Sequence, residues 1–314
     1  MIKTKAIRKI FTTTLSMFII LCVFSLMTIS LDDTLKVNLE INDISGVGNG
    51  YVYLLSKNDY LVRKNIYLDS DSDVLNIKKA LSYLIESDNN KYSSELMGVI
   101  PKDTKINEVI CGDDLVTVDF SKEILNVSIN HEKHMISSIV YTIMDLVDVD
   151  GVSILVDGEL LRSYPNTGEV FGSVLNKSIG INNRYDITSR KDINRVILYY
   201  VDLIDKDIYY VPVTKYINDD RDKIKIIIEE LTTSYIYEPN LMSFLDNKLK
   251  LVDYKEEGDV LFLNFNDYFF DSSNKVLEEV VYSIAYSVFD CYDVNMIMFE
   301  VGDNKIQSIS RSDL

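Results

Sequence analysis

The sequence predicts an α+β protein made of two tandem copies of one folding module, and three observations carry this prediction. Apolar residues recur at helical spacing from Met135 to Met144, and the same pattern returns 145 positions later from Val280 to Phe289. Alternating apolar residues at 116–120, typical of a half-buried strand, return with the same shift at 261–265. The copies share their apolar positions more than their polar ones, which favours a scaffold over a catalytic module.

Each element of the first module follows from its local pattern. The run from Asp69 to Asp73 offers N-cap residues for the apolar, helix-patterned stretch behind it. These acids also resemble the start of a calcium loop, but Val74 stands where such a loop requires glycine. A turn around Gly112 predicts a hairpin. The predicted elements are strands 51–55 and 61–68, helix 74–85, strands 106–110 and 115–120, helix 130–147 and strand 152–156.

The second module repeats this order, with its own hairpin turn around Gly258. The predicted elements are strands 196–201 and 209–213, helix 221–231, strands 249–254 and 260–265, helix 275–289 and strand 296–301. An apolar helix face needs a sheet to cover it. We therefore expect each module to be a two-layer unit, with a small mixed sheet and two helices on one face. The other face of the sheet is left toward solvent or a partner.

The beginning of the chain is typical of a membrane anchor. Four basic residues precede an uncharged apolar run from Phe11 to Leu31. About 20 apolar residues cross a bilayer, and basic flanks stay in the cytoplasm. We expect a cytoplasmic tail at 1–9, a transmembrane anchor or uncleaved signal at 10–31 and a spacer at 32–50; signal cleavage and lipidation at Cys22 are the alternatives. Modules at 51–158 and 192–314, joined by a linker at 159–191 that packs partly on the first module, then lie outside the cell membrane.

The net charge excludes one class of partner, and the positions of the cysteines argue against a disulfide framework. Only four of the 32 basic residues, and none of the 49 acidic ones, precede Asp32, so the remainder carries 28 basic and 49 acidic residues, a net charge of about −21. Such a field repels phosphate backbones, which excludes nucleic acid as a partner. Cys111 and Cys291 have no counterparts in the other copy, so they indicate no shared disulfide framework.

The residues that could carry chemistry point to structural roles. The two histidines, His131 and His134, stand three apart, and Met135 occupies the place where a zinc-protease motif needs its second histidine. Asp119 and Asp145 are the acids we would inspect first for a paired-carboxylate site, and we expect both to be structural. The sequence therefore predicts no catalytic residue, no metal site and no cofactor.

Tyrosines cluster in the first half of the second module, and the pairs Tyr199–Tyr200 and Tyr209–Tyr210 lie on predicted strands. Neighbouring residues of a strand point to opposite faces, so one member of each pair points away from the helices. One interpretation is cross-strand packing. The other is a candidate partner face, because tyrosine supplies contact area at little cost in entropy.

The first module also contains a recognisable pair of motifs. Residues 96–106 read LMGVIPKDTKI and residues 116–121 read VTVDFS. This resembles the GerM domain of sporulation and germination proteins, whose signature positions are occupied here by Pro101, Thr104, Asp119, Phe120 and Ser121. In the second copy Phe265 keeps the pattern, whereas Asp246, Asn264 and Asn266 replace the proline, aspartate and serine. The resemblance implies a fold like that of ring-building modules and tandem domains behind a membrane anchor.

The resemblance further implies a non-enzymatic, envelope-anchored protein of endospore-forming bacteria. We expect a scaffold or oligomerising protein that contacts itself or other envelope proteins, with the membrane reached through its N-terminal helix. A module that binds peptidoglycan or its fragments is the alternative. A hydrolase acting on the spore wall, using His131, Asp119 or Asp145, has the least support.

Overall fold

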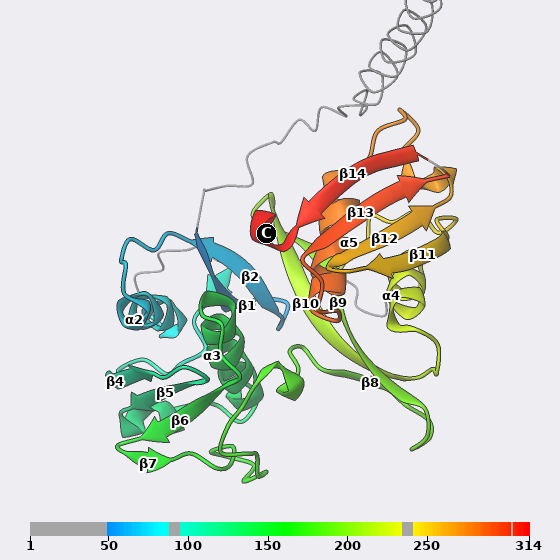
Figure 1. The fold of residues 1–314 in the computed structure, drawn as a ribbon. Coiled ribbons are helices and arrows are strands. Elements are labelled where there is room, and N and C mark those ends of the chain that lie inside the picture. Colours follow the sequence, from blue (N-terminus) through cyan, green and yellow to red (C-terminus); the bar gives the residue numbers. More distant parts are fainter. Residues whose placement is uncertain (1–48, 88–94, 234–240, 303) are drawn as a thin grey trace, which may run out of the picture.

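The computed structural model describes residues 49–87, 95–233, 241–302 and 304–314. Two modules lie side by side (Figure 1), and the predicted α+β class and tandem arrangement are confirmed. The tail at 1–9, the apolar segment at 10–31, nearly all of the spacer, Tyr235 and Tyr237 lie outside the described residues. Within the described ranges, none of the helices has the length and apolar character needed to cross a membrane.

The first module contains two sheets with its long helix between them. Strands β1 and β2 form one sheet in the order β2-β1-β3, and the other sheet has the order β4-β5-β6-β7, in which β5 and β6 run parallel. The elements are β1 (Gly50–Ser56), β2 (Leu61–Ile66), α2 (Asp73–Leu84), β3 (Leu96–Met97), β4 (Ile106–Cys111), β5 (Leu115–Phe120), α3 (Glu132–Leu146), β6 (Gly151–Val156) and β7 (Glu159–Leu160).

Helix α3 is covered on two sides, which differs from the single sheet that we expected. The apolar residues of α3 are buried, and two of its small polar residues, Ser138 and Thr142, are buried as well against β1. Ser138 Oγ donates to the carbonyl oxygen of Tyr53 at 2.6 Å, and Tyr53 N donates to Thr142 Oγ1 at 3.2 Å. Hydroxyl groups that satisfy a strand's backbone let a polar helix face enter a core. In the sequence the same face looks solvent-exposed.

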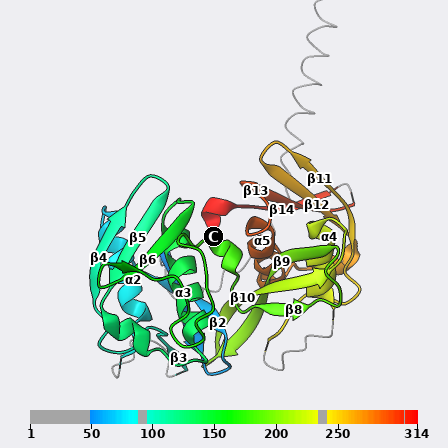
Figure 2. The same cartoon turned by 90° about the horizontal axis from the view of Figure 1, so that it is seen from below.

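The second module repeats this arrangement around α5 (Figures 1 and 2), which lies between the β9-β10 hairpin and the sheet of order β11-β12-β13-β14. Tyr199 N donates to Ser287 Oγ at 2.9 Å, as Tyr53 N does to Thr142. Strands β8 and β14 were not predicted, because their polar residues show no apolar alternation. The elements are β8 (Arg184–Asp186), β9 (Ile193–Ile204), β10 (Asp207–Asn218), α4 (Lys223–Thr232), β11 (Leu251–Glu257), β12 (Val260–Phe265), α5 (Glu278–Phe289), β13 (Met296–Val301) and β14 (Asn304–Ser310).

The modules are in contact where β2 lies beside β10 (Figure 2), and the side chain of Asn182 is hydrogen-bonded to both strands. Its side-chain amide donates to Leu61 O at 2.9 Å and to Pro212 O at 2.7 Å, while its oxygen accepts from Leu61 N at 2.9 Å. Nearly all of the described buried apolar residues of both modules belong to one continuous cluster, and a second, smaller cluster lies on the β9-β10 hairpin. The contact between modules is therefore part of the core.

The segment from 159 to 191 packs against the first module through a buried carboxylate. Glu132, at the start of α3, is fully buried and accepts hydrogen bonds from Asn166 N at 2.7 Å and Thr167 N at 3.2 Å. Burial raises the pKa of Glu132, but these hydrogen bonds outweigh it and leave the pKa below its ordinary value. The carboxylate thus remains charged while it holds the loop.

Replacing Glu132 with glutamine is expected to lower the free energy of unfolding by about 1 kcal/mol near pH 7, because charged acceptors make the stronger hydrogen bonds. The pKa of Glu132 is lower in the folded state than in the unfolded state, where it is about 4.3. The stability that this difference contributes is fully present above the unfolded pKa and is lost as the pH falls through the folded pKa. The melting temperature of the unmodified chain should therefore fall more steeply below pH 5 than that of the Glu132→Gln variant. Glu169→Gln, which removes only an exposed ion pair with Lys133, is the control. Parallel melting curves against pH would contradict this role.

Candidate functional site

The polar residues at the contact between modules are arranged as two equivalent tyrosine–aspartate pairs. Asp145 lies in the last turn of α3, and Asp290, 145 positions later, directly follows α5. Tyr53 Oη donates to Asp145 Oδ2 at 2.5 Å, and Tyr199 Oη donates to Asp290 Oδ2 at 2.7 Å. Each tyrosine comes from the strand that packs on the respective helix. The internal repeat therefore brings two carboxylates toward the same boundary.

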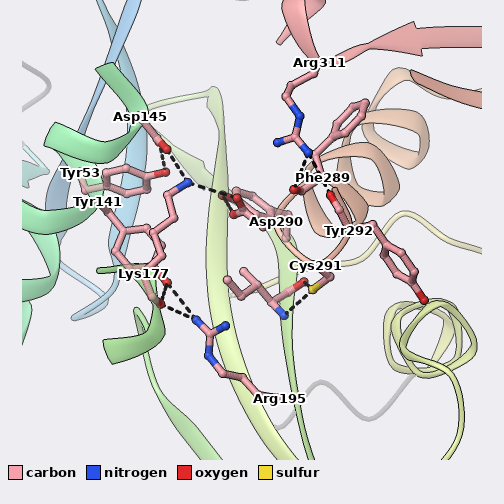
Figure 3. A network of polar contacts seen from close by, with 12 residues as sticks. Tyr53, Tyr141, Asp145, Lys177, Arg195, Phe289, Asp290, Cys291, Tyr292 and Arg311 are labelled. Carbon is pink, nitrogen blue, oxygen red and sulfur yellow. Dashed lines mark hydrogen bonds and ion pairs between the residues drawn. The ribbon is translucent and has the colours of Figure 1, made fainter. Parts of the chain in front are cut away.

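Lys177, from the short 3-10 helix η2 (Lys177–Ile179), joins these two carboxylates (Figure 3). Its ammonium nitrogen lies 2.6 Å from Asp145 Oδ1 and 3.2 Å from Asp290 Oδ1. The three side chains are 28%, 11% and 13% exposed, in the order Lys177, Asp145 and Asp290, so water screens them only partly. One ammonium group from the segment between the modules thus pairs with one acid from each module.

The charge states of this cluster follow from burial and from its partners. Burial raises the pKa of Asp145, but the charges of Lys177 and Arg63 outweigh it and hold the pKa below the ordinary value. Burial opposes the charged form of Lys177, yet the two carboxylates raise its pKa. Burial also raises the pKa of Tyr53 and Tyr199, so both hydroxyl groups keep the proton that they donate.

The backbone of Lys177 is held as firmly as its side chain. Its carbonyl oxygen accepts hydrogen bonds from Tyr141 Oη at 3.0 Å and from the guanidinium of Arg195, which comes from β9 in the second module (Figure 3). Lys177 Nζ also lies 5.6 Å from the centre of the Tyr141 ring. These contacts fix the ammonium group between the two acids.

An open cleft of about 860 Å³ lies beside this cluster, and both modules line it. Arg63 of β2 projects into the cleft between two tyrosine rings, with its guanidinium carbon 3.5 Å from the Tyr51 ring centre and 4.5 Å from that of Tyr286. The Nε atom of Arg63 is buried and has no hydrogen-bond partner among the described residues. No pattern in the sequence points to this residue, since a lone arginine on a strand is indistinguishable from any surface cation.

The four tyrosines proposed as a partner face do not form an exposed surface, and that prediction is wrong. Their exposed fractions are 2%, 8%, 4% and 6%, for Tyr199, Tyr200, Tyr209 and Tyr210 respectively. Neighbouring tyrosines do point to opposite faces, as predicted: Tyr199 and Tyr210 pack in one cluster, and Tyr200 and Tyr209 in the other.

The covering groups come from within the chain. Tyr210 stacks against Tyr282 and Tyr286 of α5, and Lys64 of the first module donates to Tyr209 Oη at 3.2 Å. Strand alternation could show that the two faces differ, but not that a helix and the other module cover them.

The signature residues of the first module form hydrogen bonds with backbone groups of the same module. Ser121 Oγ accepts from Lys105 N at 2.9 Å, and Thr104 N donates to Pro101 O at 3.2 Å. Asp119 Oδ1 accepts from Gly158 N at 3.0 Å, and Phe120 is fully buried. These contacts hold the turn before β4 and the turn after β6.

The second module makes matching contacts with different side chains. Asn266 Oδ1 accepts from Lys250 N at 3.1 Å, as Ser121 Oγ does from Lys105, and Leu249 N donates to Asp246 O at 2.9 Å. Phe265 is buried and stacks on Phe269. The substitutions therefore preserve the backbone contacts of the loop.

The remaining candidates for chemistry do not converge on one place. His131 Nε2 lies 3.4 Å from Asp59 Oδ1, and burial lowers the pKa of His134. Cys111 and Cys291 are both free thiols. Across the described part of the chain, no three His, Cys, Asp or Glu side chains are grouped in a way that could hold a metal ion. Asp145 alone among the inspected acids and histidines joins the cluster between the modules.

Comparison with known proteins gives consistent matches. The model of the Germane family, described as sporulation and spore germination, matches residues 51–162 and 197–307. The spore germination protein GerM of Bacillus subtilis (strain 168) is 28% identical over 263 residues, covering 80% of this chain and 70% of that protein. The solved tandem GerMN domains of the sporulation protein GerM from Bacillus subtilis have a TM-score of 0.74 and 26% identity, covering 83% of this chain and 97% of the solved chain. The two matched stretches coincide with the two modules.

Proposed function

Because this chain belongs to the Germane family of sporulation and spore germination proteins, with one family match in each module, we propose that it works as a scaffold or oligomerising protein in sporulation or spore germination. The GerM resemblance read from residues 96–121 is confirmed by these matches. The proposal places the two modules outside the cell membrane, held by an anchor at residues 10–31, and assigns them no catalytic step. Their partners are envelope proteins or further copies of the chain.

The observation that carries this proposal is the way in which the modules are joined. At their boundary Lys177 pairs with one acid from each module, and the apolar core continues across it. Such a joint gives the two modules a fixed relative position, which a scaffold needs in order to present two binding surfaces with constant spacing. The outer surfaces of the modules are then available for partners.

The sheet edges are the surfaces that favour protein contacts most. Strand β4 ends one four-stranded sheet and β11 ends the other. Ile110 on β4 is 53% exposed and Val252 on β11 is 64% exposed. An edge strand presents unpaired backbone groups that another chain can pair with. The charged residues of β11 oppose indiscriminate pairing and favour a partner of matching charge.

Site-specific photo-crosslinking in sporulating cells tests the scaffold proposal. A photoreactive residue at position 110 or 252 of the full-length chain is expected to form a crosslinked species with an envelope protein or a second copy. Val170, which is exposed but lies on no sheet edge, is the matched control position. Absence of crosslinks at all three positions, together with a strictly monomeric size in detergent, would overturn the proposal.

A second candidate function, binding of peptidoglycan or its fragments, is favoured by the open cleft and by its arginine, which has no hydrogen-bond partner in the part of the chain that the structure describes. Retention of the full-length protein on purified cell wall separates this function from the scaffold. Changing Tyr199 and Tyr209 together is a poor test, because both side chains are buried and their loss would disturb folding first.

A further inference from the structure

Arg63 is the cation of the cleft that makes no ion pair or hydrogen bond with any residue that the structure describes. A guanidinium carries five N–H donors, yet those of Arg63 make no hydrogen bond or ion pair with any residue that the structure describes. The other cations that line the cleft are engaged: Lys177 pairs with Asp145 and Asp290, and Arg311 donates to the carbonyl oxygens of Phe289 and Tyr292. Within the described ranges, the contacts that hold the guanidinium of Arg63 are those with the two aromatic rings.

The two tyrosine rings determine how Arg63 can be used. Tyr51 and Tyr286 each place a ring against the guanidinium, and such cation–π contacts do not use its N–H groups, which therefore remain available to a ligand. The edge of a guanidinium matches a carboxylate through two parallel hydrogen bonds. Stacking restricts the side chain before any ligand arrives, so little conformational entropy is lost on binding.

We propose that the cleft between the modules binds a peptide carboxylate of a cell-wall fragment through the guanidinium of Arg63. This inference rests on the second candidate function and is independent of the scaffold function.

The acids of the cleft select the class of ligand. Asp148 and Asp293, 145 positions apart, line the same cleft, and their carboxylates can accept hydrogen bonds from the amino groups of a ligand. A polymer linked by phosphodiester groups, such as a wall teichoic acid, carries only negative charge along its backbone and is repelled by these carboxylates. A stem peptide, which carries amino groups as well as carboxylates, meets complementary charge at both.

The structural alternative for Arg63 is charge balance. Asp145, Asp290, Lys177 and Arg63 together sum to zero charge, so Arg63 could serve only to neutralise the two acids. That role predicts a large loss of stability when the charge is removed. A residue kept for binding predicts that Arg63→Lys, which keeps a positive charge near Asp145, melts normally and yet binds weakly.

The test uses the full-length protein in detergent and soluble peptidoglycan fragments as the probe. Calorimetric titration is expected to show binding that disappears when the carboxylates of the same fragments are converted to amides. Arg63→Gln should weaken binding about tenfold or more, and Arg63→Lys should weaken it about fivefold at an unchanged melting temperature, because lysine keeps the charge but lacks the planar fork. Lys64→Gln, which removes the neighbouring charge on the opposite strand face, should bind as the unmodified protein does.

Several results would overturn the inference. They are equal binding of amidated fragments, equal binding by Arg63→Gln, or no binding of fragments to the unmodified protein. If Arg63→Gln lowers the melting temperature, Arg63→Lys decides: normal melting with weakened binding supports the site, and normal binding refutes it. Retention of Arg63→Gln on whole cell wall, equal to that of the unmodified protein, would leave wall binding intact and show that Arg63 is not its site.

Discussion

Replacing Lys177 with methionine is expected to lower the free energy of unfolding by about 3 kcal/mol. The substitution keeps the length of the side chain but leaves the carboxylates of Asp145 and Asp290 facing each other without a cation between them. Removing one partner of a buried charge cluster is far more harmful than removing the whole cluster. Chemical denaturation followed by circular dichroism measures the effect.

Two further variants make this prediction specific. The triple variant Lys177→Met, Asp145→Asn, Asp290→Asn should recover much of the lost stability, because neither unpaired carboxylate remains. Lys225→Met, which removes an exposed ion pair with Asp222, should change the unfolding free energy by less than about 0.5 kcal/mol. A triple variant no more stable than Lys177→Met alone would show that the charges are not the cause.

The stability difference between the unmodified chain and Lys177→Met should also depend on pH in a defined window. The lowered pKa of Asp145 gives stability that is complete above the unfolded value, about 3.9, and is lost as the pH falls through the folded value. The raised pKa of Lys177 gives stability that is complete below about 10.4 and is lost as the pH rises through the folded value. The difference should therefore be flat from about pH 5 to pH 9 and shrink on the acidic side first.

Replacing Asn182 with alanine is expected to lower the free energy of unfolding by about 2–3 kcal/mol. The change removes three hydrogen bonds to the backbones of Leu61 and Pro212, each contributing about 1 kcal/mol. It also places alanine at a φ of 48°, a left-handed conformation that asparagine tolerates better. The same denaturation experiment measures the loss.

Controls separate the two causes. Asn182→Gly removes the hydrogen bonds but accepts the left-handed backbone, so its loss reports the link between β2 and β10. Asn274→Ala changes an exposed asparagine with a φ of 58° and should show only the backbone cost, about 1 kcal/mol. If Asn182→Gly is as stable as the unmodified chain, the amide does not hold the modules together.

Much of the fold could be predicted because its signals are local or repeated. The helix patterns ending at Met144 and Phe289 and the strand alternations at 116–120 and 261–265 depend on neighbouring residues, and the repeat doubled each signal. The separate sheet formed by β1 and β2 could not be predicted. It depends on Ser138 and Thr142 meeting the backbone of Tyr53, a long-range contact between groups that look solvent-exposed in the sequence.

The candidate site was predictable only in fragments. Asp145 was among the acids singled out, but its partner Asp290 and the bridging Lys177 were not. Their meeting depends on how two modules pack, and no local pattern encodes that. The tyrosine prediction failed for the same reason: alternation showed that Tyr199 and Tyr200 face opposite ways, whereas the first module and α5 decide that neither side is open.

The bridging lysine has a consequence for how this chain can change through evolution. Duplication supplied two equivalent acids, but the single ammonium group that pairs with both stands in the segment that connects the modules. A substitution at either acid therefore alters the electrostatic environment of the other, although the two stand 145 positions apart. Asp145, Lys177 and Asp290 are consequently expected to change together during evolution and not one at a time.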